Sequence, residues 1–278
     1  MEEEEFIKRA EQYLNDQNHR PIDDFDGYSP LEMHYLLYEP FSEESPFKLK
    51  KLPEQDYQNV PIFNQVKYLG NLISKHGELK LTAKGFLSTK VVADIYAQGF
   101  IKEEAIENGI TKLYKETDAM CINLAHLLPK IAGLVKKRHG KLSLTKKGEK
   151  IFSDDFKLLN EIFQTFAKRF NWAYYDGYGD NPIGQLGFAF TLILLSKYGD
   201  QKRNTKFYAQ KYFNAFPHLF DSNRAYHCYT LRTFDRFLDY FGVISLESDS
   251  KSSFDFKDVT KMPLFDKMFE CKPPINST

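Results

Sequence analysis

Hydrophobic positions along much of the chain recur at intervals of three and four residues, the period of a helix that buries one face. Before residue 60 this pattern is interrupted by prolines and turn residues, and it predicts helices only over 2–15 and from Pro30 to about Tyr38. Ser29 and Pro30 would supply the N-cap and the first-turn proline of the second helix. Residues 1–60 are therefore expected to form a helical, loop-rich extension.

Between residues 61 and 153 the pattern predicts helices alternating with short strands. Helices are expected over 61–76, 88–97, 102–114, 120–134 and 146–152, and a half-buried strand over 79–81. Residues 135–144 are expected to form a β-hairpin that turns near 138–140, with Leu142 and Leu144 inside and Lys141 and Ser143 outside.

An internal repeat joins the strand and the hairpin. The segment HGELKLTAKG at His76–Gly85 matches HGKLSLTKKG at His139–Gly148 at seven of ten positions. A period of 63 residues is not that of a solenoid repeat. We expect both segments to belong to one small sheet, and two tandem half-domains are the alternative.

Beyond residue 153 the pattern predicts a buried connecting helix that ends near Phe170 and a turn-rich loop over 172–182. Further helices are expected over 186–198, 206–213, 231–241 and 263–269, and strands over 242–247 and 254–260 with a turn at 248–253. In the helix over 231–241, the predicted buried face consists of Leu231, Phe234, Leu238 and Phe241. The opposite face would carry Arg232, Asp235, Arg236 and Asp239.

The text AGLVKKRHGKLSLTKKG at Ala132–Gly148 resembles the wing region of bacterial winged-helix proteins. The resemblance covers 61–153, and a weaker likeness extends over 183–278. It implies a mainly α fold with small β-hairpins, in which two winged-helix-like domains are joined by a helix and loop at 154–182. In that family the helix before the wing usually reads DNA, which implies such a role for residues 120–134.

Charge is distributed unevenly along a chain whose formal net charge is zero. Residues 1–60 carry 15 acidic and 6 basic side chains, whereas residues 61–150 carry 16 basic and 8 acidic ones. The zero net charge argues against a protein whose whole surface binds nucleic acid or an anionic membrane. The middle of the chain is a candidate anion-binding region, unless the acidic N-terminal segment folds over it and neutralises it.

The remaining composition excludes several classes of protein. Cys121, Cys228 and Cys271 lie far apart, without the spacing of a disulfide framework or a zinc site. The longest apolar stretch is about half the ~20 residues that a membrane-spanning helix needs. We expect a soluble, cytoplasmic protein that uses no metal or cofactor and does not bind membranes.

Recognisable catalytic chemistry is missing from the sequence. It contains no GxSxG, HExxH, GxGxxG or phosphate-loop motif. His218, His227 and Cys228 lack an evident fourth ligand, and a structural role for each is favoured over metal binding. The chain is therefore not expected to be an enzyme.

The candidate site is the basic hairpin with the helix before it. A projecting hairpin can present cations to phosphates, and its basic residues are Lys136, Lys137, Arg138, His139, Lys141, Lys146 and Lys147. The polar residues of the preceding helix that could reach base edges are Asn123, His126 and Lys130. One hypothesis is therefore a regulatory protein that binds double-stranded DNA. The alternative is a protein-interaction module without DNA contact, in which these lysines form a solvated turn.

Overall fold

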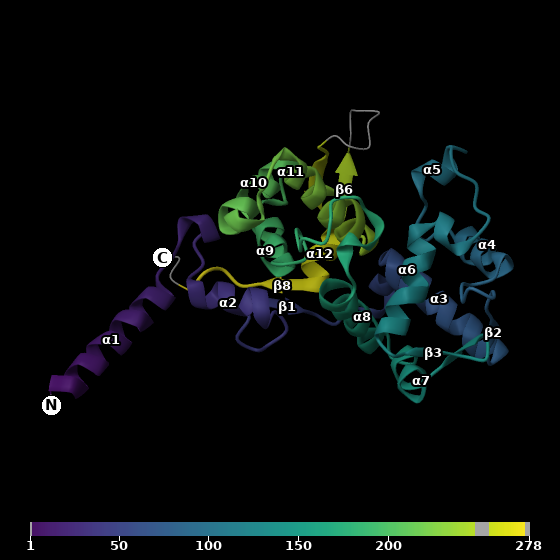
Figure 1. Cartoon of the computed structure of the whole chain (residues 1–278), viewed down its shortest axis with the longest axis horizontal. Helices are drawn as coiled ribbons and strands as arrows, with labels where there is room; N and C mark the ends of the chain where they lie inside the picture. The colour runs from purple at the N-terminus through teal and green to yellow at the C-terminus, as the bar shows by residue number, and fades with distance from the viewer. Residues whose placement is uncertain (1, 248–255, 276–278) are drawn as a thin grey trace. The chain divides into compact units, whose positions relative to one another are not determined.

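The computed structural model describes residues 2–247 and 256–275 and divides the chain into two compact units. Unit 1 consists of Met1–Lys50, Tyr178–Arg236 and Ile244–Thr278. Unit 2 consists of Lys51–Gly177 and Phe237–Val243. Both are mainly helical with small antiparallel sheets of two or three strands, which confirms the predicted mainly α fold with small β-hairpins (Figure 1).

Unit 2 contains the segment whose pattern alternates between helices and strands. Its helices are α3 (Pro61–His76), α4 (Thr89–Ala97), α5 (Glu104–Glu107), α6 (Met120–Ile131), α7 (Lys146–Phe152) and α8 (Asp155–Gln164). Its 3₁₀ and π segments are η2 (Glu54–Asn59), η3 (Glu116–Asp118), η4 (Thr165–Arg169) and η5 (Trp172–Tyr175). Its strands are β2 (Leu79–Lys80), β3 (Val135–Arg138) and β4 (Lys141–Leu144).

The three strands of unit 2 form one antiparallel sheet in the order β2-β4-β3. Leu79 pairs with Leu142, so the two copies of the repeat contribute adjacent strands of a single sheet, as expected. The helices α3 and α6 contact each other, and their buried apolar side chains include Val66, Leu69 and Leu128. The core of unit 2 therefore lies along this pair of helices.

The expected helix over 102–114 is wrong in extent. Only Glu104–Glu107 is helical. Gly109 follows with a φ of +70°, a left-handed conformation that ends helices and that glycine adopts at little cost. Ile110 and Tyr114 are exposed, at 79% and 64% of their surface, so no buried stripe is available to continue the helix.

Unit 1 combines the two ends of the chain. Its helices are α1 (Glu2–His19), α2 (Pro30–Tyr38), α9 (Phe188–Tyr198), α10 (Thr205–Ala215), α11 (Asn223–Tyr229) and α12 (Pro263–Met268), with the 3₁₀ turns η1 (Asp23–Phe25) and η6 (Pro217–Leu219). Its strands are β1 (Phe47–Leu49), β5 (Arg203–Asn204), β6 (Ile244–Glu247), β7 (Asp258–Lys261) and β8 (Phe269–Cys271). The expected turn at 248–253 and the first two residues of the expected strand 254–260 lie outside the described residues.

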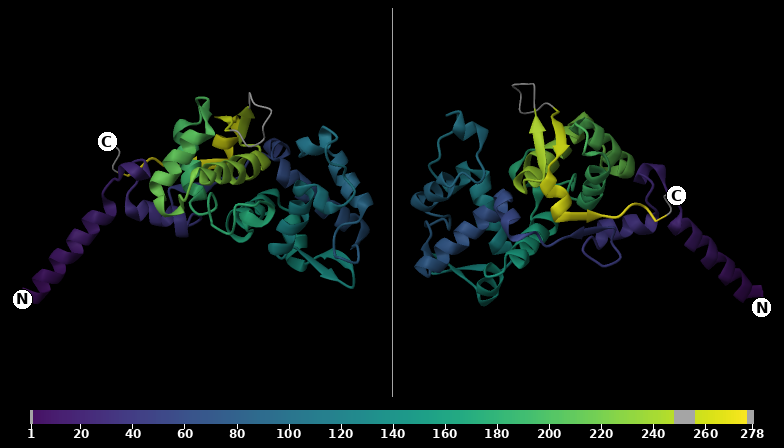
Figure 2. Two further views of the ribbon diagram at one scale, coloured as in Figure 1. Left: turned by 45° about the horizontal axis from the view of Figure 1, so that its top comes forward. Right: turned by 180° about the vertical axis from the view of Figure 1, so that it is seen from behind.

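The first fifty residues do not form an extension of their own but belong to unit 1. The strand β1 pairs with β8 near the other end of the chain, with Phe47 opposite Cys271 and Leu49 opposite Phe269 (Figure 2). Phe47 is fully buried in this arrangement. A pairing between segments more than two hundred residues apart leaves no local pattern, which explains why the sequence did not indicate it.

The helix expected over 231–241 is present, but its faces differ from the expectation. Residues Thr230–Leu238 form a π-helix, η7, whose i→i+5 hydrogen bonds rotate each side chain relative to an α-helix. Phe234, Leu238 and Phe241 are buried as predicted, whereas Leu231 is only half-buried. Arg232, expected on the polar face, is 1% exposed and donates hydrogen bonds to the carbonyl oxygens of Asn181 (2.6 Å) and Gly179 (2.8 Å).

We predict that Leu238→Ala lowers the free energy of unfolding by about 2–5 kcal/mol, because Leu238 is 1% exposed and its truncation leaves a cavity in the core. Chemical denaturation followed by circular dichroism measures this change. Lys112→Ala, at an exposed position, is the matched control and should change stability by less than about 0.5 kcal/mol. Equal stability of the two variants would contradict the burial of Leu238.

Candidate nucleic-acid interface

The hairpin of β3 and β4 turns through His139 and Gly140, as predicted. Both residues have positive φ, +48° and +71°, which is the requirement of a two-residue type I′ turn. Glycine meets this requirement easily, and histidine is among the few other residues that tolerate it. The turn fixes the register in which Val135 pairs with Leu144 and Arg138 with Lys141.

This register sorts the basic side chains between the two faces of the sheet. Successive residues of a strand point to opposite faces, and Leu142 on β4 is fully buried. Lys136, Arg138 and Lys141 therefore share the outer face, and all three are exposed. Lys137 alternates to the side of Leu142, although its own side chain is exposed near Gly85.

A further cation, Lys80, belongs to the same outer face. Lys80 on β2 pairs with Lys141 on β4, which in turn pairs with Arg138 on β3. The three residues form a row across the sheet, and Lys80 is exposed like the others. Glu78, next to β2, forms an ion pair with Lys141 and partly offsets its charge. Sequence reasoning missed Lys80, although the repeat placed it on a strand of the same sheet.

The end of the hairpin is held by the LTKKG sequence. The hydroxyl of Thr145 accepts a hydrogen bond from the backbone N–H of Gly148 (2.9 Å), which caps α7, and donates one to the carbonyl of Gly133 (2.8 Å). A Cβ atom at Gly148 would lie 2.0 Å from the carbonyl oxygen of Leu134. Only glycine allows so close an approach, so the threonine and glycine of the motif have structural roles.

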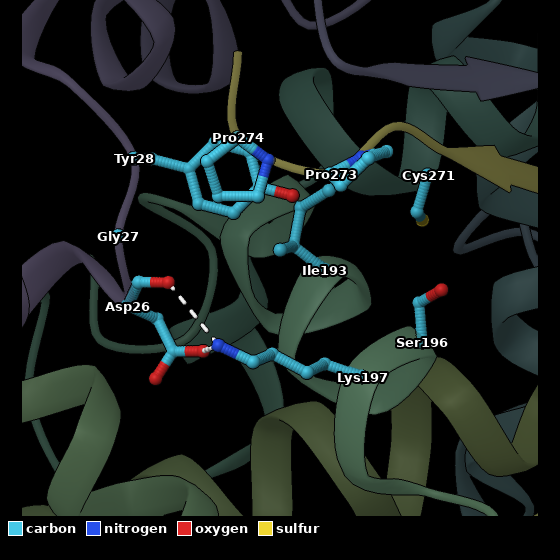
Figure 3. A pocket seen from close by; sticks show the side chains of 9 residues that line it. All are labelled: Asp26, Gly27, Tyr28, Ile193, Ser196, Lys197, Cys271, Pro273 and Pro274. Carbon is cyan, nitrogen blue, oxygen red and sulfur yellow. Dashed lines mark hydrogen bonds and ion pairs between the residues drawn. The ribbon is translucent and has the colours of Figure 1, made fainter. Parts of the chain in front are cut away.

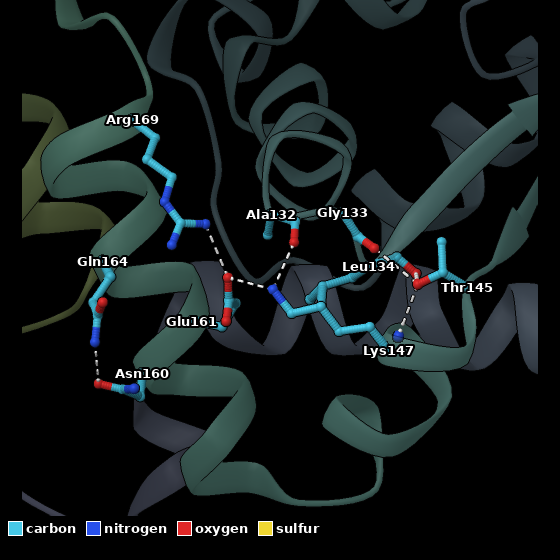
Figure 4. Close-up of polar contacts among 10 residues, drawn as sticks. Ala132, Gly133, Leu134, Thr145, Lys147, Asn160, Glu161, Gln164 and Arg169 are labelled. Carbon is cyan, nitrogen blue, oxygen red and sulfur yellow. Dashed lines mark hydrogen bonds and ion pairs between the residues drawn. The ribbon is translucent and has the colours of Figure 1, made fainter.

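The two lysines of the same motif have different environments. Lys147 donates to the carbonyl oxygen of Ala132 and to the carboxylate of Glu161, both at 2.9 Å (Figure 4). Glu161 also accepts a hydrogen bond from Arg169 at 3.0 Å. Lys147 thus links α7 to α8, although 48% of its side chain is exposed. Lys146 is exposed as well.

The structure contradicts the prediction that Asn123 and His126 reach base edges. Both lie on α6 and are buried, at 3% and 4% exposure. The side-chain amide of Asn123 donates to Glu116 at 2.5 Å, and the Nδ1 atom of His126 lies 3.0 Å from the same carboxylate oxygen. Tyr175 donates its hydroxyl proton to the side-chain amide oxygen (Oδ1) of Asn123. These polar groups are engaged inside unit 2 and are not available to a ligand.

Glu116 organises this buried network. Its side chain has no exposed surface, and its second carboxylate oxygen accepts a hydrogen bond from the backbone N–H of Leu87 at 2.5 Å. The carboxylate therefore ties the start of α4 to α6. Sequence reasoning missed Glu116 because nothing in the acidic stretch Glu116–Asp118 distinguishes a buried glutamate from an exposed one.

Only one of the three residues predicted on α6 remains accessible. Lys130, in the last turn of the helix, is exposed, as is the neighbouring Ile131. The structure therefore brings together the cations of the hairpin and β2, and it separates them from Asn123 and His126. The resulting surface can contact phosphates but contains few groups for reading bases.

A hollow of about 430 Å³ lies within unit 1 beside β8 (Figure 3). Asp26 at its edge is held by the ammonium groups of Lys197 (2.7 Å) and Lys211 (2.6 Å) and by the hydroxyl of Tyr198 (3.0 Å). Burial raises the pKa of the Cys271 thiol to about 12, so the thiol remains protonated and is a poor nucleophile. The polar groups of this hollow thus have structural partners within the chain.

Among the described residues, no helix is long and apolar enough to cross a membrane. No three His, Cys, Asp or Glu side chains there are grouped so that they could hold a metal ion.

Comparison with known proteins identifies one similarity. Residues 58–157 match the family described as the Y4jL N-terminal domain. The matched segment lies within unit 2 and contains the hairpin, α6 and Glu116. No curated protein and no solved structure matches the chain.

Asn123→Ala is expected to lower the free energy of unfolding by about 1–3 kcal/mol, because Glu116 loses a donor and Tyr175 loses an acceptor. Lys130→Ala, on the exposed side of the same helix, is the control and should leave stability within about 0.5 kcal/mol of wild type. Urea denaturation measures both variants. A wild-type stability for Asn123→Ala would mean that the network does not hold α6 in place.

Asp26 should make the stability of unit 1 depend on pH in the acidic range. Burial by itself raises the pKa of Asp26, but the hydrogen bonds and charges of Lys197 and Lys211 outweigh burial and hold the pKa below its ordinary value of 3.8. A carboxylate with a lowered folded-state pKa stabilises the fold above the unfolded-state pKa, and this contribution is lost as the pH falls through the folded-state value.

We therefore expect Asp26→Asn to cost about 1–3 kcal/mol at neutral pH, with the difference from wild type shrinking as the pH falls below about 4. Denaturant titrations at several pH values test this. Asp24→Asn, an exposed residue two positions earlier, is the matched control. A difference that stays constant down to about pH 2 would contradict the charged role of Asp26.

Proposed function

We propose that unit 2 binds the phosphate backbone of double-stranded DNA through the outer face of its β2-β4-β3 sheet. The observation that carries this proposal is the row of Lys80, Lys141 and Arg138 across three adjacent strands. Lys136 lies on the same face, and all four side chains are exposed. Phosphate contacts of this kind supply the sequence-independent part of DNA affinity.

Without a bound anion, this row of cations destabilises the sheet. Like charges directly opposite one another on neighbouring strands repel, because their Cβ atoms are only about 4.5–5.5 Å apart. Glu78 relieves this repulsion at Lys141. A bound phosphate would relieve it further, and binding would release the counterions of the DNA. The charge of unit 2 agrees with this role, since it contains 20 basic and 15 acidic residues.

The arrangement of elements supports a winged-helix interpretation of unit 2. Apart from the short helix α5 and the turn η3 inserted between α4 and α6, the order α3, β2, α4, α6, β3, β4 and the central position of β4 in the sheet are those expected for such a fold. In this interpretation the hairpin is the wing and α6 occupies the place of the recognition helix. Because Asn123 and His126 are buried, we propose contact with the DNA backbone and not the reading of base sequence.

The burial of Asn123 and His126 also favours a second candidate function. A winged helix whose α6 contributes its polar residues to the core can serve as a protein-interaction module. The basic sheet face would then meet an acidic partner protein. The two functions differ in their response to duplex DNA, which decides between them.

The test is a fluorescence anisotropy titration of the whole protein with mixed-sequence duplex DNA at several salt concentrations. The triple variant Lys80→Gln, Lys136→Gln and Arg138→Gln is expected to bind every sequence more weakly. It should lower the salt slope by up to about three units, since each phosphate contact contributes roughly −0.9. The relative affinities for different sequences should not change.

A matched control removes three other exposed lysines of unit 2, Lys75, Lys90 and Lys112. Its net charge equals that of the test variant, so a general charge effect would weaken both proteins alike. Absence of salt-dependent binding by the wild-type protein at micromolar concentration and about 50 mM salt would reject DNA as the partner and favour the interaction module.

A further inference from the structure

The N-terminal helix α1 exposes a row of large apolar side chains. Every residue from Glu3 to Arg20 is exposed, including Phe6 at 72%, Ile7 at 49%, Tyr13 at 64% and Leu14 at 59%. These four residues recur at helical spacing and form one apolar stripe on α1. A helix obtains most of its stability from packing its apolar face against another element. An apolar stripe that stays exposed to solvent therefore marks an interaction surface.

The charge of α1 excludes several partners for this stripe. The helix carries six acidic side chains, four of them in the run Glu2–Glu5, against the two cations Lys8 and Arg9. Anionic membranes and nucleic acids would be repelled by this balance. The partner is therefore expected to be a protein that offers an apolar stripe of its own.

The stripe is symmetrical about Ala10. Phe6 lies four residues before Ala10 and Leu14 four residues after it, while Ile7 and Tyr13 lie three residues before and after it. A twofold axis at Ala10 would thus place Phe6 of one helix near Leu14 of an antiparallel copy. It would likewise place Ile7 near Tyr13, with the small Ala10 at the point where the helices approach. Such self-complementarity is the property of an isologous dimer interface.

Charge also selects the antiparallel direction. In a parallel pair the four glutamates of one α1 would lie beside the four of the other. In an antiparallel pair each Glu2–Glu5 segment lies beside residues 15–18, of which only Asp16 is charged. We infer that two copies of this chain associate through an antiparallel pair of α1 helices whose contact consists of Phe6, Ile7, Ala10, Tyr13 and Leu14.

Analytical ultracentrifugation of the whole protein tests this inference. Two helices with a short stripe bury a small interface, so a reversible dimer is expected between about 10 and 200 µM, with a mass of twice 32.5 kDa. The double variant Phe6→Glu and Leu14→Glu should be monomeric over the same range. Gln12→Glu with Asn15→Glu adds the same charge on the opposite side of α1 and should still dimerise.

Disulfide formation tests the direction of the helices. Ala10→Cys is expected to cross-link the dimer, whereas Glu3→Cys should not, because antiparallel pairing separates the two copies of Glu3. The wild-type protein measures the background level of disulfide cross-linking. Its own cysteines are Cys121 and Cys228, which are buried, and Cys271, which is partly buried. Near-ultraviolet circular dichroism verifies that the rest of each variant is folded.

Three results would overturn the inference. A wild-type protein that stays monomeric up to about 200 µM would show that the stripe does not self-associate. Dimerisation that survives the double glutamate substitution would place the interface elsewhere. Cross-linking of Glu3→Cys as efficient as that of Ala10→Cys would exclude the antiparallel pair.

Discussion

The side chain of Glu116 is fully buried, and the oxygens of a buried carboxyl group must receive hydrogen bonds from the surrounding chain. Leu87 before α4, and Asn123 and His126 on α6, provide these contacts. Because the donors come from separate segments, the carboxylate fixes the rotation of α6 about its own axis. That rotation turns Asn123 and His126 toward the core of unit 2. It therefore decides which side chains of α6 pack inside the unit and which remain on its surface.

The orientation of α6 explains why the proposed interface lies on the sheet. The side chains of α6 that could have contacted base edges are used to hold the fold together. The cations of β2, β3 and β4 are not needed for the core, since Leu79 and Leu142 on the opposite face provide the apolar contacts. Cross-strand pairing then places Lys80, Lys141 and Arg138 in one row.

In unit 1, the important contacts join segments that are far apart in the sequence. The pairing of β1 with β8 and the ion pairs from Asp26 to Lys197 and Lys211 connect the first fifty residues to the remainder of the unit. These contacts leave α1 with its apolar stripe exposed. In the proposed dimer a second copy of the chain buries this stripe.

Local chemistry in the sequence was sufficient to predict the helical class, the capped helix at Pro30, the hairpin at 135–144 and the common sheet of the two repeats. Each of these depends on residues near one another in the chain, or on a repeated pattern. The tertiary structure alone decided the burial of Glu116, Asn123 and Arg232, the pairing of β1 with β8 and the row completed by Lys80. A polar residue has the same appearance in the sequence whether its partner is water or a buried group. Its role is decided only when distant segments fold together and supply, or fail to supply, that partner.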